Sequence, residues 1–200
     1  MKITVENIIK GIKYLKHYGF KEFLIRLKEK SEPEEVIYND WFVGHRVMDK
    51  QLSAQVEEVK RMKDKPMVSI LVPTFKTPEI FLKQMVKSVV QQSYDNWELC
   101  IADATPLGEG EEETSVAKFV NEFQDTRIKY LHLEKNAGIA GNTNAALAMA
   151  SGDYIGLLDH DDLLEPDALY EVILAVKNGA DMIYTDEDKV LEDLSEYYAP

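Results

Sequence analysis

A short apolar run that ends abruptly in acids limits most strongly what this chain can fold into. Residues 154–158 read Tyr-Ile-Gly-Leu-Leu, and Asp159, Asp161 and Asp162 follow within four positions. Such a run is typical of a buried strand, which places the acids at its carboxyl end. Carboxylates this close repel one another, and a divalent cation with oxygen ligands would relieve the repulsion. The run therefore predicts a metal and phosphate site, with a solvated Asp-rich turn as the alternative.

Strand and helix patterns alternate along the chain from residue 68 onward. Apolar runs predict strands at residues 68–72, 98–102, 128–133, 154–158 and 182–185. Apolar residues at helical spacing predict helices within residues 77–90, 115–123, 145–150 and 165–178, with residues 136–144 as the loop before the third helix. The alternation predicts an α/β fold with a Rossmann-like, mostly parallel sheet flanked by helices.

Polar residues follow the predicted strands at the point where each strand ends. They are Thr74, Asp103, Asn136, Asp159, Asp161 and Asp186. In a parallel sheet the carboxyl ends of the strands share one edge, where ligands bind. The expected convergence of these side chains favours a metal site over a solvated turn.

The beginning of the chain differs in character from the rest. Residues 1–65 are expected to form a helical extension and linker, and residues 66–200 the α/β domain. Residues 1–30 carry a net charge of +5 and an apolar stripe, whereas the remaining residues carry −18. A basic amphipathic segment fits an anionic membrane surface, although the same stripe could pack on the protein body. The acidic body argues against nucleic acid as a partner.

Cysteine content and hydropathy indicate the compartment. The single cysteine, Cys100, lies in an apolar run, which is typical of a core residue, and one cysteine allows no disulfide within the chain. The N-terminus lacks the apolar core of a signal peptide, and no segment approaches the roughly 18 apolar residues of a membrane span. The chain is expected in the cytoplasm, with a peripheral contact to the inner face of the cell membrane through residues 1–30.

Six motifs occur in an order that resembles one enzyme family. They are VSILVPTF (68–75), SVVQQSY (88–94), WELCIAD (97–103), NAG (136–138), NAA (144–146) and DHDD (159–162). Over about residues 66–200 this ordered set resembles family 2 glycosyltransferases of the GT-A fold. The TDEDK stretch at 185–189 is similar to the branch that makes O-antigen, rhamnan and other bacterial surface polysaccharides.

The resemblance implies a donor site for a nucleotide sugar. The residues that it places beside the nucleotide sugar are Pro73, Thr74, Phe75, Asp103, Asn136, Gly138, Asn144, Asp159 and His160. Among them, Asp103 would face the base or ribose, and Asn144 would help to fix the acidic loop. Asp161 would be the direct ligand of Mn²⁺ or Mg²⁺, and Asp159 would share that metal site nearer the ribose.

The resemblance also implies a reaction, with two departures from the family pattern. Many relatives have two successive Asp after the second strand, whereas here Ala104 follows Asp103. The family's catalytic base falls later than Pro200, so the chain resembles the donor half of a longer enzyme, and Asp186 and Asp188 are only second candidates for that base.

The implied activity is inverting, metal-dependent transfer of a sugar from a UDP or dTDP donor to a saccharide or lipid-linked acceptor. In that reaction the cation neutralises the departing diphosphate, and a carboxylate base activates the acceptor hydroxyl. One alternative is a catalytically incompetent fragment that binds nucleotide sugars or acts as a scaffold. Another is a phosphoryl-transfer or receiver-type α/β domain.

Overall fold

The computed structural model describes residues 38–199 and divides the chain into two compact units. One unit comprises Met1–Arg46 and Asp186–Pro200, of which residues 38–46 and 186–199 are described, and the other comprises Val47–Thr185. Residues 1–37 lie outside the described residues, so the structure does not test the prediction for the basic segment 1–30. The predicted boundary after residue 65 was based on sequence motifs. The two units are instead defined by contacts within the structure, which place residues 47–65 with the sheet.

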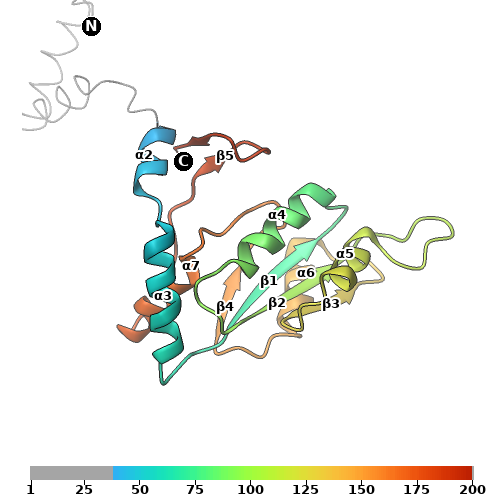
Figure 1. Cartoon of the computed structure of the whole chain (residues 1–200). Helices are drawn as coiled ribbons and strands as arrows, with labels where there is room; N and C mark the ends of the chain where they lie inside the picture. The colour runs from blue at the N-terminus through green and yellow to red at the C-terminus, as the bar shows by residue number, and fades with distance from the viewer. Residues whose placement is uncertain (1–37, 200) are drawn as a thin grey trace, which may run out of the picture. The chain divides into compact units, whose positions relative to one another are not determined.

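The larger unit contains a four-stranded sheet in which every pair of neighbouring strands is parallel (Figure 1). Its order is β3-β2-β1-β4, with bounds β1 Val68–Thr74, β2 Trp97–Asp103, β3 Ile128–His132 and β4 Tyr154–Leu157. Each strand overlaps one of the first four predicted runs. The parallel α/β sheet expected from the alternating pattern is therefore confirmed. The burial predicted for the run 154–158 is wrong, because β4 lies at the end of the strand order and its Ile155 and Leu157 are 45% and 75% exposed.

Helices cover both faces of this sheet. Their bounds are α3 Asp49–Arg61, α4 Glu79–Val90, α5 Ser115–Phe123, α6 Gly138–Leu147 and α7 Ala168–Lys177. The main core cluster joins β1 and β2 to α4, α5 and α7, with Val59 of α3. A smaller cluster packs Ala146 of α6 against Leu71, Cys100 and Ala102 on the opposite face (Figure 1). Cys100 is buried in that cluster, as expected for a core residue.

A buried carboxylate holds the amino end of the sheet together. Glu98 on β2 accepts hydrogen bonds from Ser69 Oγ at 2.6 Å and from the backbone N–H of Ser151 at 2.6 Å. Its second oxygen accepts from Ser151 Oγ at 2.8 Å and lies 2.7 Å from Lys129 Nζ. Burial alone would raise the pKa of Glu98, but the bonds from Lys129, Ser69 and Ser151 outweigh it and lower the pKa to about 2.

The loop between α6 and β4 fits against β1 only because residue 152 is glycine. A Cβ atom on Gly152 would lie 2.7 Å from the Met67 carbonyl oxygen and 2.8 Å from the backbone nitrogen of Ser69. The backbone N–H of Gly152 donates to Ser69 Oγ at 2.8 Å. This close approach fixes where β4 begins, and therefore where the acids beyond it fall.

Two predicted elements differ in the structure. Residues 182–185 form no strand, and the side chains of Met182 and Tyr184 are each 89% exposed. Within the described residues β4 pairs only with β1, so no strand pairs with this apolar segment. The third predicted helix begins at Gly138, not at residue 145, because asparagine side chains organise its first turn, as described below.

The smaller unit pairs one helix with one hairpin. Its described elements are α2 Tyr38–His45 and the antiparallel strands β5 Lys189–Val190 and β6 Tyr197–Tyr198. None of the helices between residues 38 and 199 combines the length and the apolar character that a membrane crossing requires.

Glu98 leads to a prediction about stability and pH. Its folded-state pKa of about 2 lies below the ordinary value of 4.5, so its contribution is fully present above about pH 4.5 and is lost as the pH falls toward 2. We expect Glu98→Gln to lower the free energy of unfolding by roughly 3 kcal/mol at neutral pH and by almost nothing near pH 2. Urea unfolding across this pH range measures the difference.

The matched control is Glu134→Gln, which changes an exposed glutamate in the same way. It should leave the pH dependence unchanged. A Glu98→Gln deficit that stays constant between neutral pH and pH 2 would contradict the role given to this carboxylate.

Candidate functional site

The carboxyl edge of the sheet brings two predicted site residues, Thr74 and Asp103, into contact. In the strand register Thr74 lies beside Asp103, and Asp103 lies beside His132. Thr74 Oγ1 donates to Asp103 Oδ1 at 3.0 Å, and His132 Nε2 donates to the carbonyl oxygen of Thr105 at 2.9 Å. The ends of β1, β2 and β3 and the loop after β2 are thus joined by polar contacts.

Asp103 is fully buried and receives four hydrogen bonds. Besides Thr74, the donors are the backbone N–H of Thr105 at 3.0 Å, Thr114 Oγ1 at 2.6 Å and Tyr130 O–H at 3.1 Å. Burial, together with the neighbouring Asp103 carboxylate, raises the pKa of Tyr130 to about 12. Hydrogen bonds within the protein occupy the acceptor positions of Asp103. Asp103 therefore fixes Thr74 and Thr105 in place. A direct contact with a nucleoside stays a prediction.

The segment after β1 exposes an aromatic ring and a cation. Phe75 is 40% exposed, Pro73 is partly buried, and Lys76 Nζ lies 5.4 Å from the centre of the Phe75 ring. Lys76 has a left-handed backbone with φ of 52°, and its N–H donates to Thr105 Oγ1 at 2.8 Å. This backbone is unfavourable for a non-glycine residue, so the contact with Thr105 helps to hold it.

Asparagine side chains shape the start of α6. Asn136 Oδ1 accepts hydrogen bonds from the backbone N–H of Gly138 at 2.9 Å and from Asn142 Nδ2 at 3.0 Å. Asn142 Oδ1 in turn accepts from the N–H of Ala137 at 3.1 Å. Gly138 has φ of 75°, a conformation that glycine adopts without strain. Asn144 is exposed on the same helix, and its predicted contact with the acidic loop stays a prediction.

The acids after β4 form an exposed turn. The N–H of Leu158 donates to the carbonyl oxygen of Leu71 at 3.2 Å, which anchors the chain to β1 just before Asp159. The carboxylates of Asp159 and Asp161 are exposed. His160 Nδ1 lies 3.7 Å from Asp161 Oδ1 and makes no hydrogen bond within the described residues. The turn therefore presents carboxylate oxygens outward, with an imidazole beside one of them.

These residues fit a divalent cation only as part of a shared site. Among residues 38–199 no three His, Cys, Asp or Glu side chains come together as a metal-binding group. Exposed carboxylates are hard oxygen donors, however, and Mg²⁺ is commonly held by one or two of them together with phosphate oxygens and water. Asp159 and Asp161 match that pattern.

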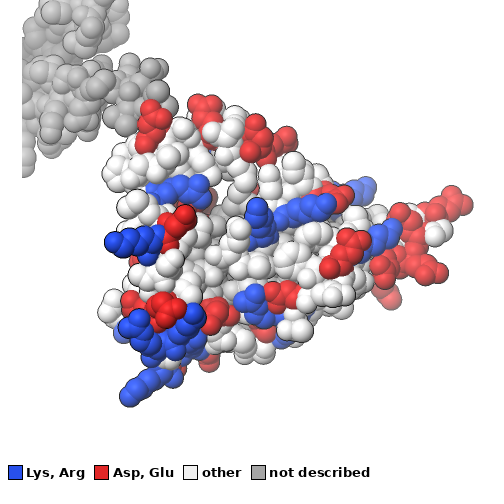
Figure 2. All heavy atoms as spheres, in the orientation of Figure 1, with Lys and Arg blue, Asp and Glu red and all other residues white. Residues whose placement is uncertain are grey.

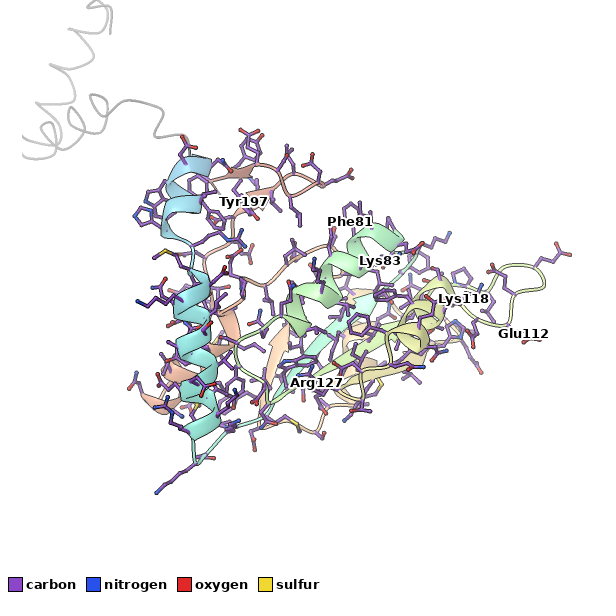
Figure 3. All side chains as sticks on the ribbon, in the orientation of Figure 1. Phe81, Lys83, Glu112, Lys118, Arg127 and Tyr197 are labelled. Atoms are coloured by element: carbon purple, nitrogen blue, oxygen red, sulfur yellow. The ribbon has the colours of Figure 1, made fainter. Side chains whose placement is uncertain are left out.

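The loop between β2 and α5 adds negative charge at the carboxyl end of β2. Figure 2 shows acidic side chains gathered at its tip, where the sequence reads Glu109, Glu111, Glu112 and Glu113. Lys118 Nζ on α5 lies 3.8 Å from Glu111 Oε1, and Figure 3 shows Lys118 and Glu112 in this region. Acids repel a bare diphosphate, so an anionic ligand at this edge would need a compensating cation.

Several residues of this edge that hold predicted site residues or their loops were not themselves predicted. They include Thr114, Tyr130, His132 and Asn142. The density of asparagine between residues 136 and 144 could have indicated Asn142, because this residue type bonds to nearby backbone groups. The other three are recognisable only from contacts between strands and loops that are distant in sequence.

Comparison with known proteins gives relatives among bacterial proteins. The chain is 36% identical to a protein of Sinorhizobium fredii named y4gI, over 79% of this chain and 17% of that protein. It is 31% identical to the O-antigen biosynthesis protein RfbC of Myxococcus xanthus, over 69% and 11%. It is 35% identical to the Escherichia coli UDP-Glc:α-D-GlcNAc-diphosphoundecaprenol β-1,3-glucosyltransferase WfgD, over 60% and 46%.

The chain spans less than half the length of each of these relatives. A match to the family described as Glycosyl transferase family 2 extends over residues 69–199, which includes the whole parallel sheet except its first residue. Because this match covers well over half of the 200 residues, the chain belongs to glycosyl transferase family 2.

Proposed function

We propose that this chain carries the donor-binding part of an inverting, metal-dependent glycosyltransferase. The donor would be a UDP- or dTDP-sugar, and the acceptor a saccharide or lipid-linked saccharide in the synthesis of a cell-surface polysaccharide. Relatives named for O-antigen biosynthesis and for transfer from UDP-Glc to a diphosphoundecaprenol-linked sugar support the substrate classes. The sequence motifs and the family membership support the reaction.

The observation that carries the proposal is the exposed acidic turn after β4. A buried carboxylate gains stability from hydrogen bonds within the protein, as Asp103 does. Asp159 and Asp161 instead face outward at the edge where ligands bind in parallel sheets. Exposed oxygen donors at this position suit a cation shared with a bound diphosphate.

Each part of the edge would have its own task in donor binding. A divalent cation held by Asp161, with Asp159 beside it, would act as a Lewis acid on the departing diphosphate. Pro73, Thr74 and Phe75 would lie along the nucleobase and ribose, and the exposed Phe75 ring offers an apolar face. Asn136, Gly138 and His160 would border the nucleotide sugar, and Asn144 would support the acidic turn.

A catalytically incompetent nucleotide-sugar-binding fragment is the second candidate. It shares the donor site and differs only in lacking transfer. The position of the catalytic base separates the two candidates. We propose that this base lies after Pro200, with Asp186 and Asp188 as second candidates, which the motif order supports.

Metal-dependent donor binding is the first expected outcome. UDP or dTDP should stabilise the chain only when Mn²⁺ or Mg²⁺ is present, by about 2.7 kcal/mol at a hundredfold excess over the dissociation constant. Asp161→Asn should remove this metal-dependent part, because an amide is a poor substitute for a carboxylate ligand. Thermal unfolding with UDP, dTDP, GDP and CDP, each with and without metal, measures both effects.

The matched control is Asp181→Asn, which makes the same change at an exposed residue outside the proposed site. It should keep the full metal-dependent stabilisation. Equal stabilisation of wild type and Asp161→Asn would show that the metal is held elsewhere.

Transfer by the 200-residue chain should be very slow if the base lies after Pro200. Loss of general-base help typically lowers a rate by about 10² to 10⁴. Radiolabelled donor with a saccharide acceptor measures transfer, and metal-dependent donor binding on the same sample confirms that the site is intact. Rapid turnover would contradict this placement of the base, and Asp186→Asn and Asp188→Asn would then identify the group responsible.

We also propose a peripheral contact between residues 1–30 and an anionic membrane. Each Lys or Arg near such a surface contributes roughly 1 kcal/mol, so a net charge of +5 predicts weak, salt-sensitive binding. The protein should sediment with anionic vesicles at low salt, remain in solution with neutral vesicles, and lose anionic binding when residues 1–30 are removed. Equal partitioning of the intact and shortened proteins would assign the segment to packing on the body.

A further inference from the structure

The helix α2 packs against the hairpin β5–β6, although the two are far apart in sequence. The rings of Phe42 and Tyr197 stack with their centres 4.2 Å apart. The Arg46 guanidinium lies 5.4 Å from the centre of each ring, and its Nη1 donates to the Tyr197 hydroxyl at 3.2 Å. Figure 3 shows Tyr197 beside α2. One aromatic side chain of the hairpin is therefore held by Phe42 of the helix and by Arg46, which directly follows the helix.

Polar contacts extend this interface toward the acids that precede the hairpin. The backbone N–H of Tyr197 donates to Asn39 Oδ1 at 3.1 Å. The Tyr38 hydroxyl donates to Asp188 Oδ1 at 2.5 Å, and this bond raises the pKa of Tyr38 to about 12. The shift reflects the loss of this hydrogen bond that ionisation of the phenol would cause. Asp188 is fixed by a residue 150 positions earlier in the chain.

Neither partner has much stability without the other. The hairpin has two strands of only two residues each, and a two-stranded hairpin is at best marginally stable in water. Leu194, in the loop that joins the two strands, has a left-handed backbone with φ of 60°. The eight residues of α2 are likewise fewer than an isolated helix needs. Contact between them therefore supplies order that the local sequences do not.

We infer that α2 is a positioning element for the segment 186–199, with Tyr38 as the positioning residue for Asp188. Residues 38–46 precede the family match at 69–199. The inference therefore gives a role to a segment that lies outside the family match. It deepens the proposed function and rests on it, because the position of Asp188 has a catalytic meaning only if the chain takes part in sugar transfer. The contact itself is testable without donor or acceptor.

Hydrogen exchange in the 200-residue chain tests the dependence of the hairpin on α2. Phe42→Ala removes the ring that stacks on Tyr197, and we expect exchange of the amides of Leu191 and Tyr197 to accelerate at least about tenfold. Val43→Ala is the matched control, because Val43 lies on the same helix and is 59% exposed. It should leave these rates unchanged. Unchanged hairpin exchange in Phe42→Ala overturns the inference, as does an equal acceleration in Val43→Ala.

Amides of β1 and β2 serve as the internal reference for both variants. Acceleration restricted to the hairpin supports the inference, whereas equal acceleration in the sheet would mean global destabilisation and overturn a local role. Metal-dependent stabilisation by UDP, measured on the same samples, reports on the proposed function separately. Its absence from wild type would refute donor binding while leaving the exchange result valid.

The bond between Tyr38 and Asp188 has its own spectroscopic readout. In protein labelled at the tyrosine ζ carbons, the signal lost in Tyr38→Phe identifies Tyr38. Its titration midpoint should lie near pH 12 in wild type and fall toward the ordinary value of about 10 in Asp188→Asn. Asp193→Asn, at another acid of the hairpin, should leave it near 12. A midpoint that Asp188→Asn does not move overturns the assignment of Tyr38.

Discussion

A carboxylate that is buried must be surrounded by hydrogen-bond donors, and β2 carries such a group at each end. Glu98 collects donors from β1, β3 and the loop before β4, and Asp103 collects them from β1, β3, the following loop and the cap of α5. Leaving either group partly unsatisfied would cost several kcal/mol. The loops at both edges of the sheet therefore take the positions that these two side chains require.

The carboxyl edge combines a carboxylate that is fully hydrogen-bonded within the protein with carboxylates that are exposed. Asp103 has used its acceptor positions internally, so it can hold Thr74 and Thr105 in place. Thr105 in turn holds Lys76 in a left-handed conformation that it would rarely adopt alone. Asp159 and Asp161, by contrast, stay exposed. This division allows a rigid frame to present groups that remain available to a ligand.

The sequence was informative where a pattern is local and less so where contacts are distant. Apolar runs located four strands, each of which has a neighbour in the sheet. The residues of β1 and β2 are almost all buried, whereas β3 and β4 are partly exposed. The same reasoning was wrong for residues 182–185, since a strand also needs a partner, which periodicity does not report. The start of α6 was misjudged because side chains of Asn136 and Asn142 replace backbone partners there. Asp159 and Asp161 could be located from the sequence as acids at a strand end. The hydrogen bonds that fill the acceptor positions of Asp103 could not, because they come from the distant Thr114 and Tyr130.

The pairing of α2 with the hairpin has a consequence for the order of events during synthesis. Val47–Thr185 is one uninterrupted stretch, so the sheet unit can fold as soon as it has left the ribosome. Arg46 must wait for Tyr197, 151 residues later, which at ordinary translation rates takes roughly eight to thirty seconds. During that interval Phe42 lacks the ring of Tyr197, and the nascent helix presents an apolar side chain to chaperones and to neighbouring chains.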